Sequence, residues 1–144
     1  MRRAVAASLA VAFLFGVKSC GDPYGSAKDR VEDFMEEIRE KEGMEAVRYL
    51  HPTFRDTLVR DLKLPVQFTE MKPSEVLACL LSSMGSGIKD VEVGEGSRID
   101  DRTVKLKVRV KDRNELEKIF NFVLVREEEE WFIADITPYT LERK

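Results

Sequence analysis

The sequence predicts one α+β domain in which N-terminal helices pack in the concave face of a curved, antiparallel, four-stranded sheet. Apolar residues recur at helical intervals as far as Met84, and from Ile88 onward apolar and polar residues alternate. Residues 85–87, Gly-Ser-Gly, separate the two halves. A run of helices followed by a run of strands favours an α+β domain, and 144 residues suffice for one such domain.

We expect up to four helical segments in the first half. The first begins at a cap-like sequence over residues 26–29, carries an amphipathic apolar stripe and ends at Gly43. A second, short helix covers residues 44–50, and a third covers residues 52 to about 62. The fourth covers residues 73–84, between an opening proline and a closing glycine.

The second half predicts four strands joined as a meander. The first strand covers residues 88–93, and the glycine-rich residues 94–97 turn the chain. The clearest half-buried strand covers residues 104–110, where aliphatic residues alternate with lysine and arginine. Residues 119–125 are apolar on both faces, which is typical of a central strand, and residues 131–136 form the last strand. Because strands that are apolar on both faces need cover, the sheet is expected to curl around the helices.

The first twenty residues have the character of an export signal. Two arginines precede an apolar run over residues 4–17, which is short for a permanent membrane-spanning helix. The run ends in Val-Lys-Ser-Cys, closing on Cys20, and resembles the signal of bacterial lipoproteins, in which a small residue precedes a cysteine that becomes lipid-modified. Lys18 departs from that signal. The predicted organisation is a signal peptide over residues 1–19, a lipidated Cys20 with a tether over residues 20–25, and the folded domain over residues 26–144.

This resemblance implies an exported protein on the periplasmic side of the bacterial cell envelope, anchored in the membrane by acyl chains. An ordinary signal-peptidase site would instead leave a soluble periplasmic or secreted domain, in which Cys20 and Cys79 could form a disulfide. Cys79 lies in the apolar run over residues 76–81, and we expect it to be a small buried core residue.

The composition excludes several classes of function. Removing the first nineteen residues leaves 21 basic and 27 acidic residues, a formal charge of −6, so the domain has no electrostatic reason to bind nucleic acid. One histidine and two cysteines exclude the common zinc sites and disulfide frameworks. The sequence has no phosphate-binding glycine loop and no nucleophile elbow, and we expect neither a cofactor nor a metal. Few amide side chains and many charged ones indicate a thermophilic source.

The order of elements and two local sequences resemble the nuclear transport factor 2-like fold, a cone-shaped α+β domain also described as ketosteroid isomerase-like or cystatin-like. Residues 46–50, Ala-Val-Arg-Tyr-Leu, look like the family's helix with a small residue followed by Tyr-Leu. Residues 122–126, an acidic turn and residues 131–133 look like its closing hairpin, although the turn is made of glutamates where glycine is more usual. The resemblance covers about residues 26–138 and includes small bacterial lipoproteins of unknown function.

The resemblance implies a pocket at the open end of the cone, where enzymes of the superfamily use an Asp base with Tyr or protonated Asp donors. Asp135 shares the alternation of Trp131, which would turn it inward, although a place at the sheet end or at a turn is the alternative. Asp135 and Tyr49 are the acid–base candidates, and Tyr49, Asn121 and Trp131 are candidates for lining a ligand pocket. None has a partner at a catalytic spacing, and His51, which precedes a proline at a helix junction, has the character of a surface residue.

Three functional hypotheses follow. The first is a non-enzymatic envelope lipoprotein that binds a partner protein or a small apolar ligand near the membrane. The second is a small pocket enzyme of the ketosteroid-isomerase type, which requires Asp135 and Tyr49 to converge in an enclosed cavity. The third is a structural role in which the exposed sheet pairs with a second copy to form a homodimer; the basic face of residues 104–110 argues against a dry interface there.

Overall fold

The computed structural model describes residues 24–61 and 70–139. The expected signal peptide, Cys20 with its possible disulfide, and most of the tether lie outside these residues. Of the helices in the described part of the chain, none is both long enough and apolar enough to cross a membrane.

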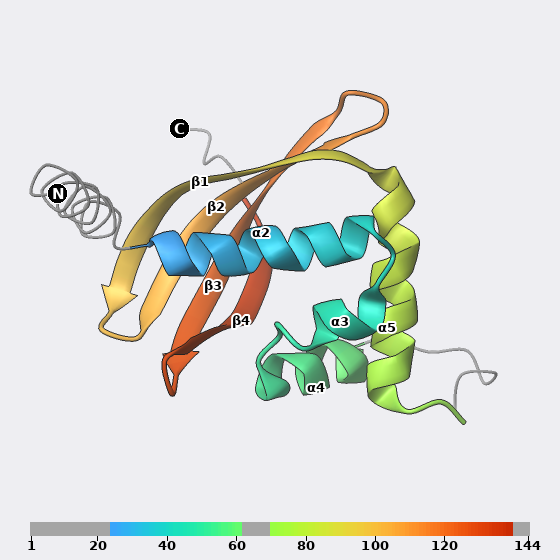
Figure 1. The fold of residues 1–144 in the computed structure, drawn as a ribbon, viewed down its shortest axis with the longest axis horizontal. Helices are drawn as coiled ribbons and strands as arrows, with labels where there is room; N and C mark the ends of the chain where they lie inside the picture. The colour runs from blue at the N-terminus through green and yellow to red at the C-terminus, as the bar shows by residue number, and fades with distance from the viewer. Residues whose placement is uncertain (1–23, 62–69, 140–144) are drawn as a thin grey trace, which may run out of the picture.

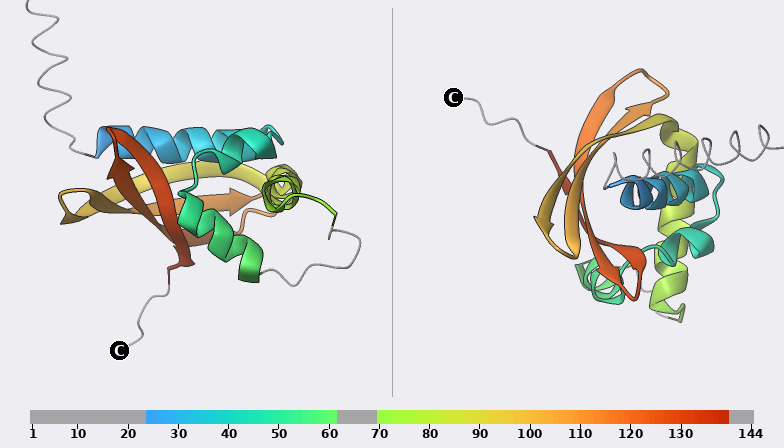
Figure 2. Two further views of the ribbon diagram at one scale, coloured as in Figure 1. Left: turned by 90° about the horizontal axis from the view of Figure 1, so that it is seen from below. Right: turned by 60° about the vertical axis from the view of Figure 1, so that its left-hand side comes forward.

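The helices lie on one side of a curved sheet, as the sequence predicts. The helix α2 (Gly25–Arg39) crosses the concave face, and α5 (Pro73–Met84) stands at one end of it (Figure 1). The short helices α3 (Gly43–Val47) and α4 (Pro52–Asp61) lie beside α5. Figure 2 shows the sheet curling around α2, so the predicted α+β fold class is confirmed.

Four antiparallel strands form the sheet in the order β1-β2-β3-β4. They are β1 (Ile88–Asp100), β2 (Thr103–Asp112), β3 (Glu117–Glu127) and β4 (Glu130–Pro138), and a 3-10 turn (Gly85–Gly87) joins β1 to α5. In β2 the side chains of Val104, Leu106 and Val108 are buried, and the lysines and arginine that alternate with the aliphatic residues are mostly exposed. The period-two pattern therefore identified the core face of this strand correctly.

The core lies between α2 and the sheet. Five residues of α2 at helical intervals are buried: Ala27, Val31, Phe34, Met35 and Ile38. The ring of Phe34 meets that of Phe122 in β3 edge to face, with centroids 6.2 Å apart. Leu106, Leu124 and Ile133 contribute fully buried side chains from three strands. The amphipathic stripe of α2 is thus stabilised by packing on the sheet.

Two sequence predictions at the ends of α2 are wrong. Ser26 does not cap the helix, which already begins at Gly25; its Oγ instead accepts a hydrogen bond from Nε1 of Trp131 at 3.1 Å. Gly43 does not end this helix but begins α3. A Cβ on Gly43 would lie 1.8 Å from the carbonyl oxygen of Ala78 in α5, so a glycine stands there because two helices touch.

The predicted turn over residues 94–97 is also wrong, because β1 continues through it to Asp100. The pairing of β1 with β2 shifts register between Val93 and Gly96, which is the mark of a bulge. A Cβ on Gly96 would lie 2.9 Å from the ring of Tyr24. The glycines therefore allow one long strand to bend and let the ring of Tyr24 pack closely against its backbone.

Residues 49–51 extend the sheet where the sequence predicted the end of a helix. Leu50 forms an isolated parallel bridge with Ile133 of β4. The N–H of Ile133 donates to the carbonyl of Tyr49 at 2.9 Å, and the N–H of His51 donates to the carbonyl of Ile133 at 2.8 Å. The segment between α3 and α4 is thereby fixed against the edge of β4.

Cys79 is exposed, so the prediction of a buried core residue is wrong. The helix α5 buries Val76, Leu77 and Ala78, with Leu81 one turn further. The apolar run surrounds the helix, but α5 packs on only one side, because it stands at the end of the sheet. Cys79 therefore points away from the packed side.

Candidate functional site

An apolar cavity lies between the C-terminal half of α2, the end of α5 and the concave face of the sheet. Its volume is about 330 Å³. The side chains around it are almost all hydrocarbon: Phe34, Met35, Ile38, Leu81, Met84, Ile88, Val110, Leu116, Phe120, Phe122 and Ile136. Such a wall offers dispersion contacts and shelter from water, which suits an apolar ligand.

Two charged residues stand at this cavity, Asp112 and Lys118. The Oδ1 atom of Asp112 accepts hydrogen bonds from the backbone N–H groups of Asn114 at 2.8 Å and Leu116 at 3.0 Å. This carboxylate therefore shapes the turn after β2. The side chain of Lys118 forms no ion pair or hydrogen bond with any residue that the structure describes.

The mouth of the cavity has an apolar rim. Met84, at the end of α5, is 55% exposed, and Leu116, in the turn between β2 and β3, is 62% exposed. Both side chains also line the cavity. Exposed apolar side chains that extend an apolar cavity to the surface are typical of a ligand-binding site.

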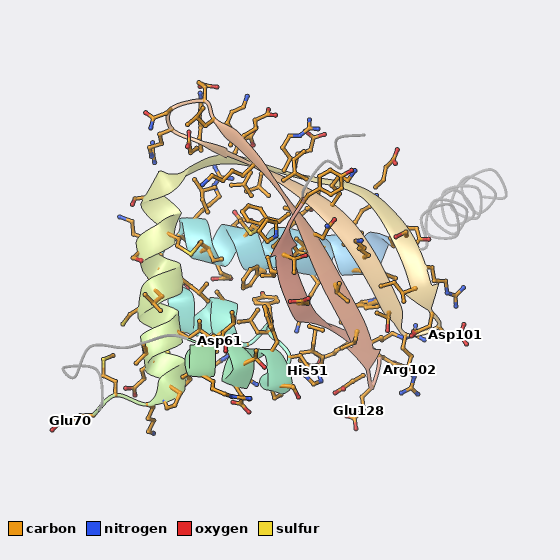
Figure 3. The ribbon with its side chains drawn as sticks, turned by 180° about the vertical axis from the view of Figure 1, so that it is seen from behind. His51, Asp61, Glu70, Asp101, Arg102 and Glu128 are labelled. Atoms are coloured by element: carbon orange, nitrogen blue, oxygen red, sulfur yellow. The ribbon has the colours of Figure 1, made fainter. Side chains whose placement is uncertain are left out.

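A second, more polar hollow lies outside the sheet, between the start of α4 and the turn joining β1 to β2. It is an open groove of about 860 Å³. In Figure 3, His51 stands at the start of α4, Asp101 and Arg102 at the end of the β1–β2 hairpin, and Glu128 at the tip of the neighbouring hairpin. Hydrogen bonds from backbone and side-chain groups of Arg102 and Thr103 lower the pKa of Asp100, which also lines the groove.

Tyr49 is half-buried against the core but lines neither hollow. The guanidinium of Arg30 stands over its ring, 4.4 Å from the centroid, and Phe34 meets the ring edge to face. Burial and the nearby carboxylates of Asp33 and Glu37 raise the pKa of Tyr49. This phenol is a packing residue between α2 and the 49–51 segment.

Asp135 is exposed, and this overturns the ketosteroid-isomerase hypothesis in the form that pairs it with Tyr49. In the pairing of β3 with β4, Leu124 faces Ile133 but Val123 faces Asp135, so Ala134 is an extra residue. This bulge breaks the alternation that would have turned Asp135 inward. Its side chain lines the outer groove.

The other two predicted lining residues also stand away from the apolar cavity. Asn121 pairs with Lys107 and Thr137 and is half-buried, on the face of β3 opposite to Phe120 and Phe122. Trp131 lies near the start of α2, where its carbonyl accepts a hydrogen bond from Nε of Arg30 at 2.9 Å. The structure therefore brings none of the candidates together in a pocket.

Sequence reasoning missed Lys118, although the signal was present. Lys118 has the same parity along β3 as Phe120 and Phe122, which are the inward residues. Its side chain thus lies at the concave face where the strand leaves the core.

As for metals, the described residues contain no group of three or more His, Cys, Asp or Glu side chains that could hold an ion.

Comparison with solved structures supports the fold. A proposed NTF2-like transpeptidase from Campylobacter jejuni superposes with a TM-score of 0.53 and 16% identity, covering 76% of this chain and 97% of that one. A proposed calcium/calmodulin dependent protein kinase II association domain from Xanthomonas campestris gives a TM-score of 0.46 with 11% identity, over 75% and 80% of the two chains. At such identities the first likeness shows the nuclear transport factor 2-like fold alone.

Sequence comparison shows the family. An uncharacterized protein of Aquifex aeolicus (strain VF5) is 51% identical over 123 residues, which cover 85% of this chain and 84% of that protein. The model of a domain of unknown function, DUF4878, matches residues 18–134. With its helices followed by a curved four-stranded sheet, this chain belongs to the DUF4878 family.

Proposed function

We propose that this protein is a lipid-anchored envelope protein that holds a small apolar ligand in the cavity between α2, α5 and the sheet. The observation that carries the proposal is the wall of the cavity, which is almost entirely hydrocarbon and continues to the surface at Met84 and Leu116. A ligand that fills this space would remove apolar surface from water on both partners, which is the main favourable term in such binding.

Binding, rather than catalysis, is the function that the cavity favours. The carboxylate of Asp112 accepts hydrogen bonds from two backbone N–H groups of its own turn, so its role is to stabilise that turn. The candidate acid–base pair from the sequence does not meet. A general acid or base has to stand within hydrogen-bond reach of the reacting group, and apart from Asp112 the only ionisable side chain among the described lining residues is Lys118, which is exposed at the mouth.

The ligand part of the proposal is tested with an apolar fluorescent probe, 1-N-phenylnaphthylamine, added to the purified full chain. We expect saturable enhancement of its emission. The variant Ile136→Trp places a larger ring in the cavity and is expected to abolish this signal, whereas Thr137→Trp, on the exposed next position of β4, keeps it. If Ile136→Trp fails to fold, Val110→Phe makes the same test from β2. Absence of saturable binding to the wild-type chain overturns the ligand proposal.

The anchor part of the proposal rests on the lipoprotein-like sequence that ends at Cys20. Several buried acyl chains hold a protein firmly, because each buried methylene contributes about 0.8 kcal/mol. We expect the intact mass of the protein from its native membranes to equal the chain from Cys20 plus acyl groups, and Cys20→Ser to release it from the membrane fraction. An unmodified mature chain would overturn the anchor and leave the ligand proposal standing.

A further inference from the structure

We propose that the ligand of the apolar cavity is an amphiphile with an alkyl chain and an anionic head, the chain lying in the cavity and the head against Lys118. This inference rests on the proposed function and adds the chemical class of the ligand. Three features of the cavity mouth support it: the place of Lys118, the engagement of the neighbouring carboxylates, and the apolar rim.

Lys118 is the cation of the cavity wall. It faces Val110 across the β2–β3 ladder and has the parity of Phe120 and Phe122, whose rings line the interior. Its side chain is exposed, so the ammonium reaches solvent at the point where the hydrocarbon wall ends. A lysine at this position places a positive charge at the entrance and leaves the interior apolar.

The neighbouring carboxylates are already engaged, whereas the ammonium of Lys118 has no partner among the described residues. Asp112 accepts the backbone N–H groups of its own turn. Glu115 forms ion pairs with Lys89 and with Lys111, and the Nζ of Lys111 also lies 3.9 Å from Oε1 of Glu117. An anionic head would supply the missing partner, and carboxylate or phosphate oxygens form charge-assisted hydrogen bonds with an ammonium.

The apolar rim indicates the path that the ligand's alkyl chain would take into the cavity. Met84 and Leu116 are more than half exposed and stand at the same mouth as Lys118. An alkyl chain that runs from a head at the surface into the interior would cover both side chains. A compact apolar ligand buried among the phenylalanines would leave the rim in water and Lys118 unused, so the amphiphile accounts for more of what the mouth presents.

The test is displacement of bound 1-N-phenylnaphthylamine by three compounds with the same chain and different heads: dodecanoate, dodecanol and dodecyltrimethylammonium, all below their micelle-forming concentrations. We expect dodecanoate to bind roughly three- to tenfold more tightly than dodecanol, and the cationic compound to bind most weakly. Added salt is expected to weaken the binding of dodecanoate and to leave the binding of dodecanol unchanged.

With displacement corrected for each variant's own affinity for the probe, Lys118→Gln is expected to lose the preference for dodecanoate, whereas Lys105→Gln, on the outer face of β2, keeps it. Probe binding with equal displacement by all three heads, or a preference that survives Lys118→Gln, overturns this inference and leaves the proposed function intact. Absence of probe binding overturns both. Comparison of dodecanoate with a dodecanoyl lysophosphatidate then distinguishes a free fatty acid from an anionic lysolipid as the source of the head.

Discussion

Nε2 of His51 lies 2.8 Å from Oε1 of Glu127, a contact that links the start of α4 to the end of β3. The backbone N–H of Thr53 donates to Nδ1 of the same ring at 3.2 Å. A nitrogen that accepts a hydrogen bond carries a lone pair, so the neutral ring bears its proton on Nε2 and donates it to Glu127. His51 therefore caps α4 and fastens it to the sheet with one side chain.

We expect His51→Ala to lower the free energy of unfolding by about 1–2 kcal/mol, since the loss of a helix cap alone costs about that much. Urea denaturation at neutral pH measures the change. Glu127→Gln keeps a hydrogen-bond acceptor for Nε2 and is expected to cost less, and Glu128→Gln, one residue further in the turn, is the control. Equal stability of His51→Ala and the wild-type chain would show that the contact does not hold α4.

Glu37 is expected to make the folded protein less stable as the pH rises. Burial of its side chain, and the carboxylates of Glu42, Glu40 and Glu45, raise its pKa in the folded state. The folded chain therefore binds this proton more tightly than the unfolded chain, which favours folding below the unfolded pKa. That contribution is lost as the pH rises through the raised pKa.

Glu37→Gln is consequently expected to raise Tm at neutral pH, because the amide avoids a charge near three carboxylates. The gain should shrink as the pH falls, since the wild-type carboxyl then becomes protonated. Thermal unfolding at a series of pH values checks this, with the exposed Glu36→Gln as the control on the same helix. A gain that is independent of pH would contradict the electrostatic explanation.

The turn between β3 and β4 carries two glutamates in the left-handed region, Glu128 with φ 49° and Glu129 with φ 70°. A two-residue hairpin turn of this kind favours Asn-Gly, because non-glycine residues with positive φ carry a steric cost. We expect the double change Glu128→Asn with Glu129→Gly to raise the free energy of unfolding by about 1 kcal/mol. Denaturant unfolding measures this change. A loss of stability would mean that the two glutamates make contacts that offset the steric cost of their positive φ.

Cys79 is expected to react with a thiol reagent in the native state, because its side chain is exposed on α5. A chain carrying Cys20→Ser leaves Cys79 as its one thiol. With Ellman's reagent we expect one equivalent to be released at a rate that urea raises only slightly. Cys79→Ser is the control, and it is expected to change the free energy of unfolding by less than about 0.5 kcal/mol, as exposed substitutions usually do. Reaction only after unfolding would show that the thiol is covered.

The order of the helices and strands could be predicted from the sequence, because each period reports which side chains a helix or a strand buries. The apolar stripe of α2, with Val31, Phe34 and Ile38, is buried as expected. In β2, Leu106 is buried and its two neighbours are exposed, again as expected. The fold class followed, since two half-apolar layers of this kind can bury their faces only against each other.

The candidate site was decided by the tertiary structure. One extra residue in the pairing of β4, Ala134, removed Asp135 from the inward face, and β1 continued through the predicted turn, with a bulge near Gly96, as far as Asp100. Periodicity assumes perfect pairing, and a single unpaired residue exchanges the two faces of a strand. Cys79 was likewise mispredicted because an apolar run does not reveal how many sides of a helix will be covered.

The sequence by itself thus determined the layers of this protein and which residues of most elements face the core. Only the tertiary structure decided where the core stops short of closing, with Lys118, Met84 and Leu116 at the opening. The reason is physical: burial of an apolar face is a local property of residue spacing, whereas a cavity is the volume that three separate elements fail to fill when they meet.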